Sequence, residues 1–303
     1  MKKTLTSLLM AATMSGASAD VIRLNHGDSA TTHSLGFGAS KDNQLQLVLP
    51  EGVYDDPVGY GITLAPYTHL QGRPTTVQEP ITAQGYNNIT GIHNEFPNLG
   101  GHQIGYTAFR LEGQGIDLQN CSGDGNYAIE SRGVLNVPQT DDRVTTGGPV
   151  IENVVQQNRF SNYMVGIDNE STHTLKIRHN IMDDNSVGAV SNGYLDLGEI
   201  YFIERGSKGN AQFGDGFNVF YKNVKNAILE PDTFTNAEGN WWYDKKGNLL
   251  TEEGEILETI DALTSGTINL KRSGASIDVI PAQGYDHPEF QPFTSVSDWQ
   301  QYE

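Results

Sequence analysis

Apolar and polar residues alternate in short stretches that recur along the middle of the chain. When residues 150–171 are aligned with residues 172–193, equivalent residues are 22 positions apart throughout. The matched pairs are Val155 with Ile177, Phe160 with Met182, Val165 with Val187, Gly166 with Gly188 and Asn158 with Asn180. A fixed period of this length is typical of a solenoid, in which each turn of the chain stacks on the previous one. The pattern therefore predicts stacked coils of short, parallel strands.

Within one repeat, the alternation predicts which side chains form the core. Leu175 and Ile177 are expected to point inward, while Lys176 and Arg178 share the outer face of the same strand. The matched asparagines are expected at an internal turn, where stacked amides can bond along the axis of the coils. The sequence thus predicts both a core face and an asparagine ladder.

Motifs outside the repeat carry a resemblance to a known family. An apolar strand at 47–49 leads into Pro50-Glu51-Gly52-x-Tyr54, followed by Gly-Ile-x-Leu at 61–64 and x-x-Leu-x-Gly at 68–72. Asn240-Trp241-Trp242 closes the region. These motifs resemble the pectate-lyase-like superfamily of right-handed parallel β-helices, over roughly residues 45–243. The resemblance implies an all-β fold and is not specific for one activity.

The remaining chain divides around this solenoid. We expect a signal peptide at 1–19, a parallel β-helix domain at 20–250 and a C-terminal cap or tail at 251–303. The period is lost between Gly193 and Phe217, where a glycine-rich run predicts a long loop leaving the coil. Helical spacing of apolar residues over 252–263 predicts a helix within the cap.

The first residues have the pattern of an export signal. Lys2 and Lys3 precede a short apolar stretch and the small residues Ala17-Ser18-Ala19. Cleavage near Ala19 predicts a secreted or periplasmic protein with no membrane insertion. Without Lys2 and Lys3, 17 basic residues face 37 acidic ones, a net charge near −20, which argues against nucleic acid as a partner. Cys121 has no second cysteine with which to form a disulfide, and the oligomeric state stays open.

The densest group of reactive side chains lies in the repeat itself. Lys176 and Arg178, with His173 and His179, are candidates for a catalytic base or a clamp on a substrate carboxylate. Arg159, one coil earlier, and Tyr194 and Tyr201, beside the glycine-rich run, are candidates for substrate binding. Charged side chains on a solvent-facing strand are also an ordinary structural feature.

Acidic residues add a second possibility. Many lyases of the superfamily hold calcium against the substrate carboxylate through acidic side chains, and the resemblance implies Asp168, Asp183 and Asp184 as ligands of Ca²⁺. Asp183 with Asp184, or Asp168 with either, would alternatively supply the paired carboxylates of a glycoside hydrolase. Of the motifs typical of the hydrolase branch, only this Asp-Asp is present.

The leading hypothesis is a polysaccharide lyase or epimerase acting outside the cytoplasm. The alternatives are a noncatalytic module that binds glycan or protein, and a glycoside hydrolase with paired carboxylates. Tyrosines early in the chain are further candidates to line a glycan groove, because sugar rings stack on flat apolar faces. These are Tyr54, Tyr60 and Tyr67.

Overall fold

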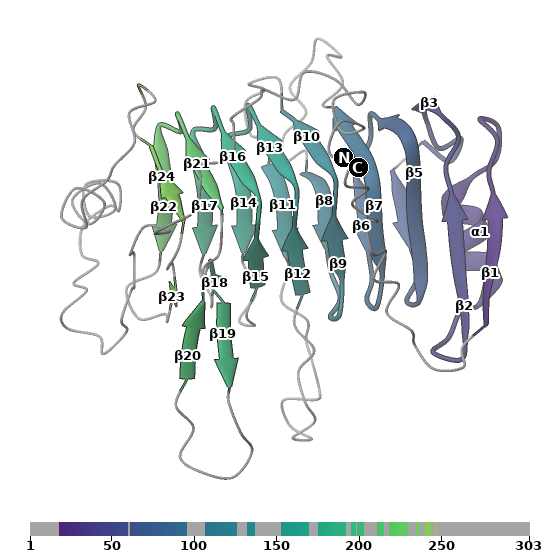
Figure 1. Ribbon diagram of the computed structural model, residues 1–303. Helices are drawn as coiled ribbons and strands as arrows, with labels where there is room; N and C mark the ends of the chain where they lie inside the picture. The colour runs from purple at the N-terminus through teal and green to yellow at the C-terminus, as the bar shows by residue number, and fades with distance from the viewer. Residues whose placement is uncertain are drawn as a thin grey trace, which may run out of the picture.

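The computed structural model is built almost entirely of short parallel strands (Figure 1). It describes residues 18–59, 61–95, 107–125, 132–136, 153–169, 175–191, 195–197, 199–202, 211–214, 218–229, 235–236, 240–243 and 246. The expected C-terminal cap at 251–303, with its helix, lies outside the described residues. Two long parallel sheets account for most of these residues, so the all-β expectation is confirmed.

The larger sheet begins as one set of strands and then continues as two columns. The first strands are β1 (Ser18–Arg23), β2 (Asn43–Val48), β3 (Gly52–Tyr54), β5 (Thr68–Val77) and β7 (Asn88–Glu95). Column I contains β9 (Asp117–Gln119), β12 (Asn153–Gln156), β15 (Leu175–Arg178), β18 (Leu195–Asp196) and β23 (Thr235–Asn236). Column II contains β10 (Ser122–Asp124), β13 (Arg159–Ser161), β16 (Ile181–Asp183), β21 (Val219–Tyr221) and β24 (Trp241–Trp242).

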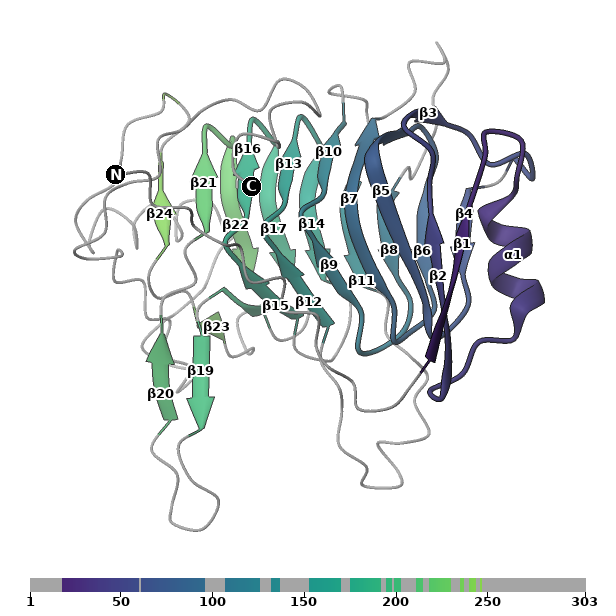
Figure 2. The ribbon, with the colours of Figure 1, turned by 45° about the vertical axis from the view of Figure 1, so that its right-hand side comes forward.

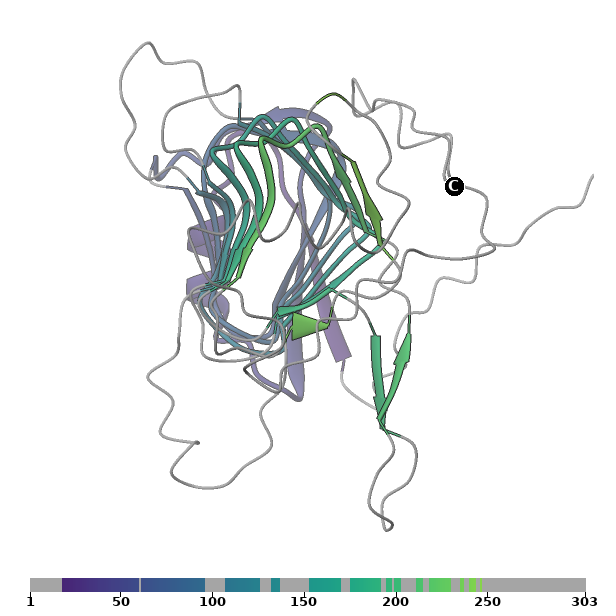
Figure 3. The same cartoon turned by 90° about the vertical axis from the view of Figure 1, so that its left-hand side faces the viewer.

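The second sheet forms another side of the same stack. Its strands are β4 (Ile62–Leu64), β6 (Ile81–Ala83), β8 (Thr107–Leu111), β11 (Arg132–Asn136), β14 (Val165–Asn169), β17 (Val187–Ser191) and β22 (Lys225–Leu229). Seen along the stack, the strands of successive coils superimpose on three sides (Figure 3). One complete coil therefore contains one strand from column I, one from column II and one from the second sheet.

The strand register confirms the repeat of 22 residues. The structure pairs Val155 with Ile177, Phe160 with Met182 and Val165 with Val187, each through parallel neighbouring strands. Phe160, Met182 and Ile177 are fully buried. Inward-facing apolar side chains therefore stack from coil to coil and form one continuous core.

The asparagine ladder is also confirmed. The Asn158 backbone N–H donates to Asn180 Oδ1 over 2.9 Å, and the Asn158 side-chain amide donates to the same oxygen over 3.0 Å. Asn180 repeats both bonds onto Asn218, and Asn218 onto Asn240. The ladder lies at the turns between columns I and II, where it satisfies backbone groups that the bend removes from the sheet.

A helix that the sequence analysis did not predict covers the N-terminal end of the stack (Figure 2). It is α1 (Ala30–Phe37), which starts after Ser29 and ends at Gly38 in a left-handed conformation. The Ser29 side chain accepts a hydrogen bond of 3.0 Å from the Thr32 backbone N–H. The buried residues of α1 are Ala30, Thr31 and Ser34. They are small or polar, so the sequence lacks the apolar stripe that marks most surface helices.

The helix satisfies the edge of the second sheet. Strand β4 is the last strand of that sheet, and its Thr63 backbone N–H donates to the Thr31 hydroxyl over 3.0 Å. The backbone N–H of Ala65, two residues later, donates to the Ser34 hydroxyl over 2.7 Å. Because an open strand edge can pair with another chain, α1 acts as an N-terminal cap.

The long excursion expected between Gly193 and Phe217 is confirmed. Val187 pairs with Lys225, so that this coil contains 38 residues in place of 22. Part of the excursion is an antiparallel hairpin of β19 (Glu199–Phe202) and β20 (Ala211–Gly214), which projects from the stack in Figure 1. Among the described residues, no helix is long and apolar enough to cross a membrane.

Candidate functional site

The outer face of column II collects polar and charged side chains from four neighbouring strands. Its inward residues Gly123, Phe160 and Met182 are in register, so the residues on either side of them face outward. One outward row contains His93, Ser122 and Arg159. The other outward row contains Glu95, Asp124, Ser161 and Asp183. We call these seven residues the column II face.

Arg159 and Asp183 form the most buried ion pair of this face. The Arg159 Nε–H donates to one carboxylate oxygen of Asp183 over 3.0 Å and an Nη–H donates to the other over 2.5 Å. The two side chains are 11% and 2% exposed. The Ser161 hydroxyl donates to the same carboxylate over 2.5 Å. Asp183 is thus bound on both oxygens, and the pair ties β13 to β16.

His93 and Ser122 lie opposite each other on β7 and β10. The Ser122 hydroxyl and His93 Nδ1 are 2.7 Å apart, and the serine is buried. Burial lowers the pKa of His93, while the charges of Glu95 and Asp124 act in the opposite direction. A histidine ring nitrogen within hydrogen-bond distance of a serine hydroxyl is the arrangement of a general base beside a nucleophile.

Glu95 and Asp124 are directly opposite each other in the register of β7 and β10. Neighbouring strands are about 4.8 Å apart, so the two carboxylates lie side by side. Asp124 accepts a hydrogen bond of 3.0 Å from the Asn162 side chain, and Glu95 accepts one of 3.4 Å from Gln78. These carboxylates are only partly buried, which leaves them accessible to a ligand.

Lys176 and Arg178 face outward on β15, as expected, but in column I. Arg178 is committed to the structure, because its guanidinium donates to the Asp196 carboxylate over 2.6 Å and to the Asp196 carbonyl over 2.9 Å. Its side chain is 11% exposed. The ion pair links β15 to β18, so a role as base or clamp would require Arg178 to leave Asp196.

The remaining candidates for catalysis and substrate binding are dispersed. His179 is an exposed turn residue with a left-handed backbone, φ 54°, between β15 and β16. Tyr201 lies in β19 of the projecting hairpin. His173 and Tyr194 lie outside the described residues. The structure thus brings Arg159 and Asp183 together, and places His179 at the boundary between the two columns.

The proposed calcium ligands are on different sheets. Asp168 is buried on β14 of the second sheet, whereas Asp183 ends β16 in column II and Asp184 follows it. Burial raises the pKa of Asp184, and the charge of Asp183 adds to this effect. Over the described ranges, no three His, Cys, Asp or Glu side chains are grouped so as to hold a metal ion. Calcium stays a prediction.

The structure describes two of the early tyrosines, Tyr54 and Tyr67. Tyr54 is fully buried, and its hydroxyl accepts a hydrogen bond from Ala30 N–H and donates to the Asp28 carbonyl. The expectation that Tyr54 lines a groove is therefore wrong, since the side chain anchors α1. Tyr67 stacks on Tyr86 with ring centroids 4.7 Å apart. Tyr60 lies outside the described residues.

Glu79 is a buried glutamate whose ionisation should make the free energy of unfolding depend on pH. It is 8% exposed and accepts hydrogen bonds from the backbone N–H groups of Asp56 and Gly61 over 2.7 and 3.2 Å. Burial raises its pKa to about 7, and the charges of Asp56 and Asp55 add to this, against the opposing effect of the two N–H donors. The folded protein therefore binds this proton more tightly than the unfolded chain.

The stabilising contribution of Glu79 is complete below about pH 4.5 and is lost as the pH rises through about 7. We expect the free energy of unfolding to fall by about 2 to 3 kcal/mol across this window, because a shift of one pKa unit corresponds to about 1.4 kcal/mol. Urea unfolding at a series of pH values measures this. Glu79→Gln should flatten the dependence, and equal slopes in both proteins would contradict the assignment.

Comparisons with known proteins identify no relative. No family model, no curated protein and no solved structure matches the chain.

Proposed function

We propose that this protein is an exported right-handed parallel β-helix of the pectate-lyase-like type that binds an extracellular polysaccharide along the column II face. The observation that carries the proposal is the continuous outward row Glu95, Asp124, Ser161 and Asp183, with His93, Ser122 and Arg159 beside it. Its strands repeat at about 4.8 Å, close to the length of one sugar ring. A linear glycan along the stack would therefore meet the partly exposed groups of Glu95, Asp124 and Ser161 on successive coils.

The charge of the face favours a neutral polysaccharide. Three carboxylates share the face with one arginine, which is already paired with Asp183. Acidic polymers would be repelled by these groups and by the net charge of −18. Hydroxyl groups of a neutral sugar would instead donate hydrogen bonds to the accessible oxygens of Glu95 and Asp124.

Binding of neutral and acidic polysaccharides to the protein, measured by affinity electrophoresis or calorimetry, tests the proposal. The double variant Glu95→Gln and Asp124→Asn should bind the preferred polymer about tenfold or more weakly, because hydrogen bonds to ionised groups are lost. Asp42→Asn is the matched control, since Asp42 is an exposed carboxylate in the turn before β2. Equal affinity of the unmodified protein, the double variant and the control would show that the polysaccharide does not bind to the column II face.

A glycoside hydrolase is the second candidate, favoured by the register of Glu95 opposite Asp124. Retaining glycosidases hold their two carboxyl groups about 5 to 5.5 Å apart, which is close to the separation of neighbouring strands. New reducing ends that disappear in either single variant would establish hydrolysis. Unsaturated uronyl absorbance that depends on Lys176 would instead support the lyase or epimerase hypothesis.

A further inference from the structure

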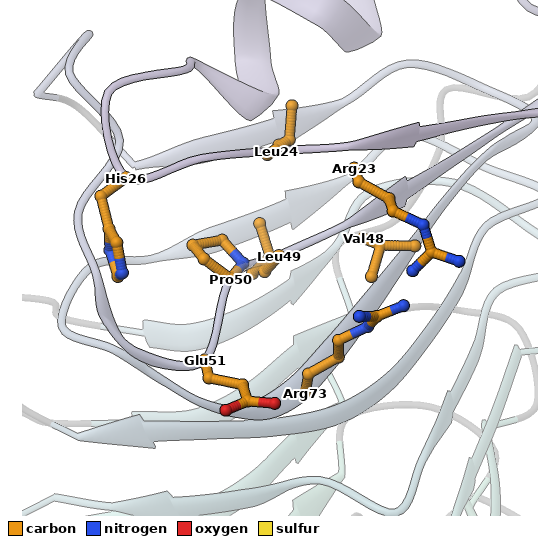
Figure 4. A pocket seen from close by; sticks show the side chains of 8 residues that line it. All are labelled: Arg23, Leu24, His26, Val48, Leu49, Pro50, Glu51 and Arg73. Carbon is orange, nitrogen blue, oxygen red and sulfur yellow. The ribbon is translucent and has the colours of Figure 1, made fainter.

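A depression of about 320 Å³ lies at the N-terminal coils, far along the stack from β16 (Figures 1 and 4). Its apolar lining consists of Pro50 and of Leu24, Val48 and Leu49, which are at most 5% exposed, and its polar lining consists of Arg23, Arg73, His26 and Glu51. Figure 4 shows the guanidinium groups of Arg23 and Arg73 close to one another beside Val48. The depression is therefore a basic site on a strongly acidic protein.

The backbone brings the two arginines together from different coils. Arg23 ends β1, where it pairs with Val48 of β2. Arg73 lies in β5, in an irregularity where the register with β7 breaks between Gln71 and Thr75. Its backbone N–H donates to the Thr75 hydroxyl over 2.8 Å in place of a ladder bond. A bulge of this kind redirects a side chain, here back toward β2.

Glycine at position 72 is needed for this local geometry. A Cβ there would lie 2.0 Å from the Gly91 carbonyl oxygen, which belongs to the backbone of β7. Backbone atoms cannot move aside as a flexible side chain can, so Gly72 lets the two strands approach at the irregularity. The position of Arg73 is thus a consequence of the tertiary structure of β5 and β7.

The electrostatics of the depression also differ from those of the other arginine sites. The ion pairs among the described residues join Arg110 to Glu112, Arg159 to Asp183 and Arg178 to Asp196. Over the same residues, neither Arg23 nor Arg73 forms an ion pair, although Glu51 lies on the same rim. Two neighbouring guanidinium groups repel each other, and an oxyanion between them would remove that repulsion.

We propose that this depression binds the carboxylate or sulfate group of an acidic saccharide. The guanidinium groups of Arg23 and Arg73 donate hydrogen bonds to the oxyanion, because guanidinium matches the planar or tetrahedral arrangement of its oxygens. The sugar ring lies against Pro50, the apolar lining residue that is only partly buried. The site is separate from the column II face and does not depend on the function proposed for that face.

Calorimetric titration of the whole protein with glucuronate, glucose 6-sulfate, glucose and inorganic sulfate tests this proposal. We expect both charged sugars to bind and glucose not to bind. Arg23→Gln and Arg73→Gln should each weaken binding about tenfold or more, and Glu51→Gln should strengthen it by removing a competing charge. Arg110→Gln is the matched control, because Arg110 is an exposed arginine of the second sheet. Circular dichroism verifies that each variant is folded.

The four probes distinguish the sources of the oxyanion. Binding of both sugars and of sulfate, lost in the arginine variants, supports an oxyanion site. Tighter binding of the sugars than of sulfate supports a contact between the sugar ring and Pro50. Absence of binding, or equal binding by the double variant of Arg23 and Arg73, overturns the proposal. The variants at Glu95 and Asp124 should leave these affinities unchanged. Failure of the proposal for the column II face can therefore be distinguished from failure of the proposal for the depression.

Discussion

Replacing Asp183 by Asn is expected to lower the free energy of unfolding by about 3 to 5 kcal/mol. The substitution keeps the shape of the side chain but removes the charge that Arg159 faces at 3.0 Å and 2.5 Å. The Arg159 side chain is 11% exposed, so the cation would stay buried without the carboxylate that binds two of its nitrogens. Breaking one half of a buried pair costs far more than the intact pair contributes.

Equilibrium unfolding in urea, followed by circular dichroism, measures this loss. Asp184→Asn is the matched control, because the neighbouring carboxyl is less buried and should change the free energy of unfolding by less than about 1 kcal/mol. The double variant Arg159→Met and Asp183→Leu should recover most of the lost stability, since it leaves no charge behind. A loss in the double variant as large as that in Asp183→Asn would show that the charge is not responsible.

Replacing Asn180 by Ala is expected to cost about 3 kcal/mol or more, because one side chain satisfies several buried groups. Its amide donates to the Val155 and Arg178 carbonyls, each over 2.8 Å, and its oxygen accepts from Asn158. Without it, the Asn158 backbone N–H would be buried without the acceptor that it has in the folded protein. The next residue of the ladder, Asn218, would lose its contact as well.

The measurement is again urea unfolding, with Gln156→Ala as control. Gln156 is an amide of the neighbouring coil on the partly solvated outer face, where its hydrogen bonds to Asp117 are 3.2 and 3.3 Å long. Water can replace those bonds, so the control should lose less than about 1 kcal/mol. Similar losses in both variants would mean that the ladder has no special role in stability.

The repeat, its core face and the asparagine ladder were all predictable from the sequence. The offset of 22 residues aligns Phe160 with Met182 and Asn158 with Asn180, and the structure pairs the same residues. The helix α1 was not predictable in this way. Its contacts with β4 are made by Thr31 and Ser34, whose hydroxyl groups give no apolar periodicity.

The candidate site was only partly predictable. Arg159 and Asp183 were identified, and they lie 24 residues apart within the regular repeat. His93, Ser122, Glu95 and Asp124 were missed, because no equivalent regularity relates them. His93 is 29 residues from Ser122, and Ser122 pairs with Arg159 a further 37 residues along the chain. A simple offset search cannot align coils of unequal length, although alternation around buried Gly123 marks Ser122 and Asp124 as outward-facing.

The sequence by itself determined which side chains face inward and that the coils stack, because alternation and repetition are local properties of the chain. The tertiary structure decided which outward side chains meet. Excursions of different length between strands bring Glu95 opposite Asp124, and the irregularity at Gly72 places Arg73 in the same depression as Arg23. Parallel stacking turns separations of about 20 to 40 residues into a distance of about 4.8 Å, and only the folded register specifies the partners.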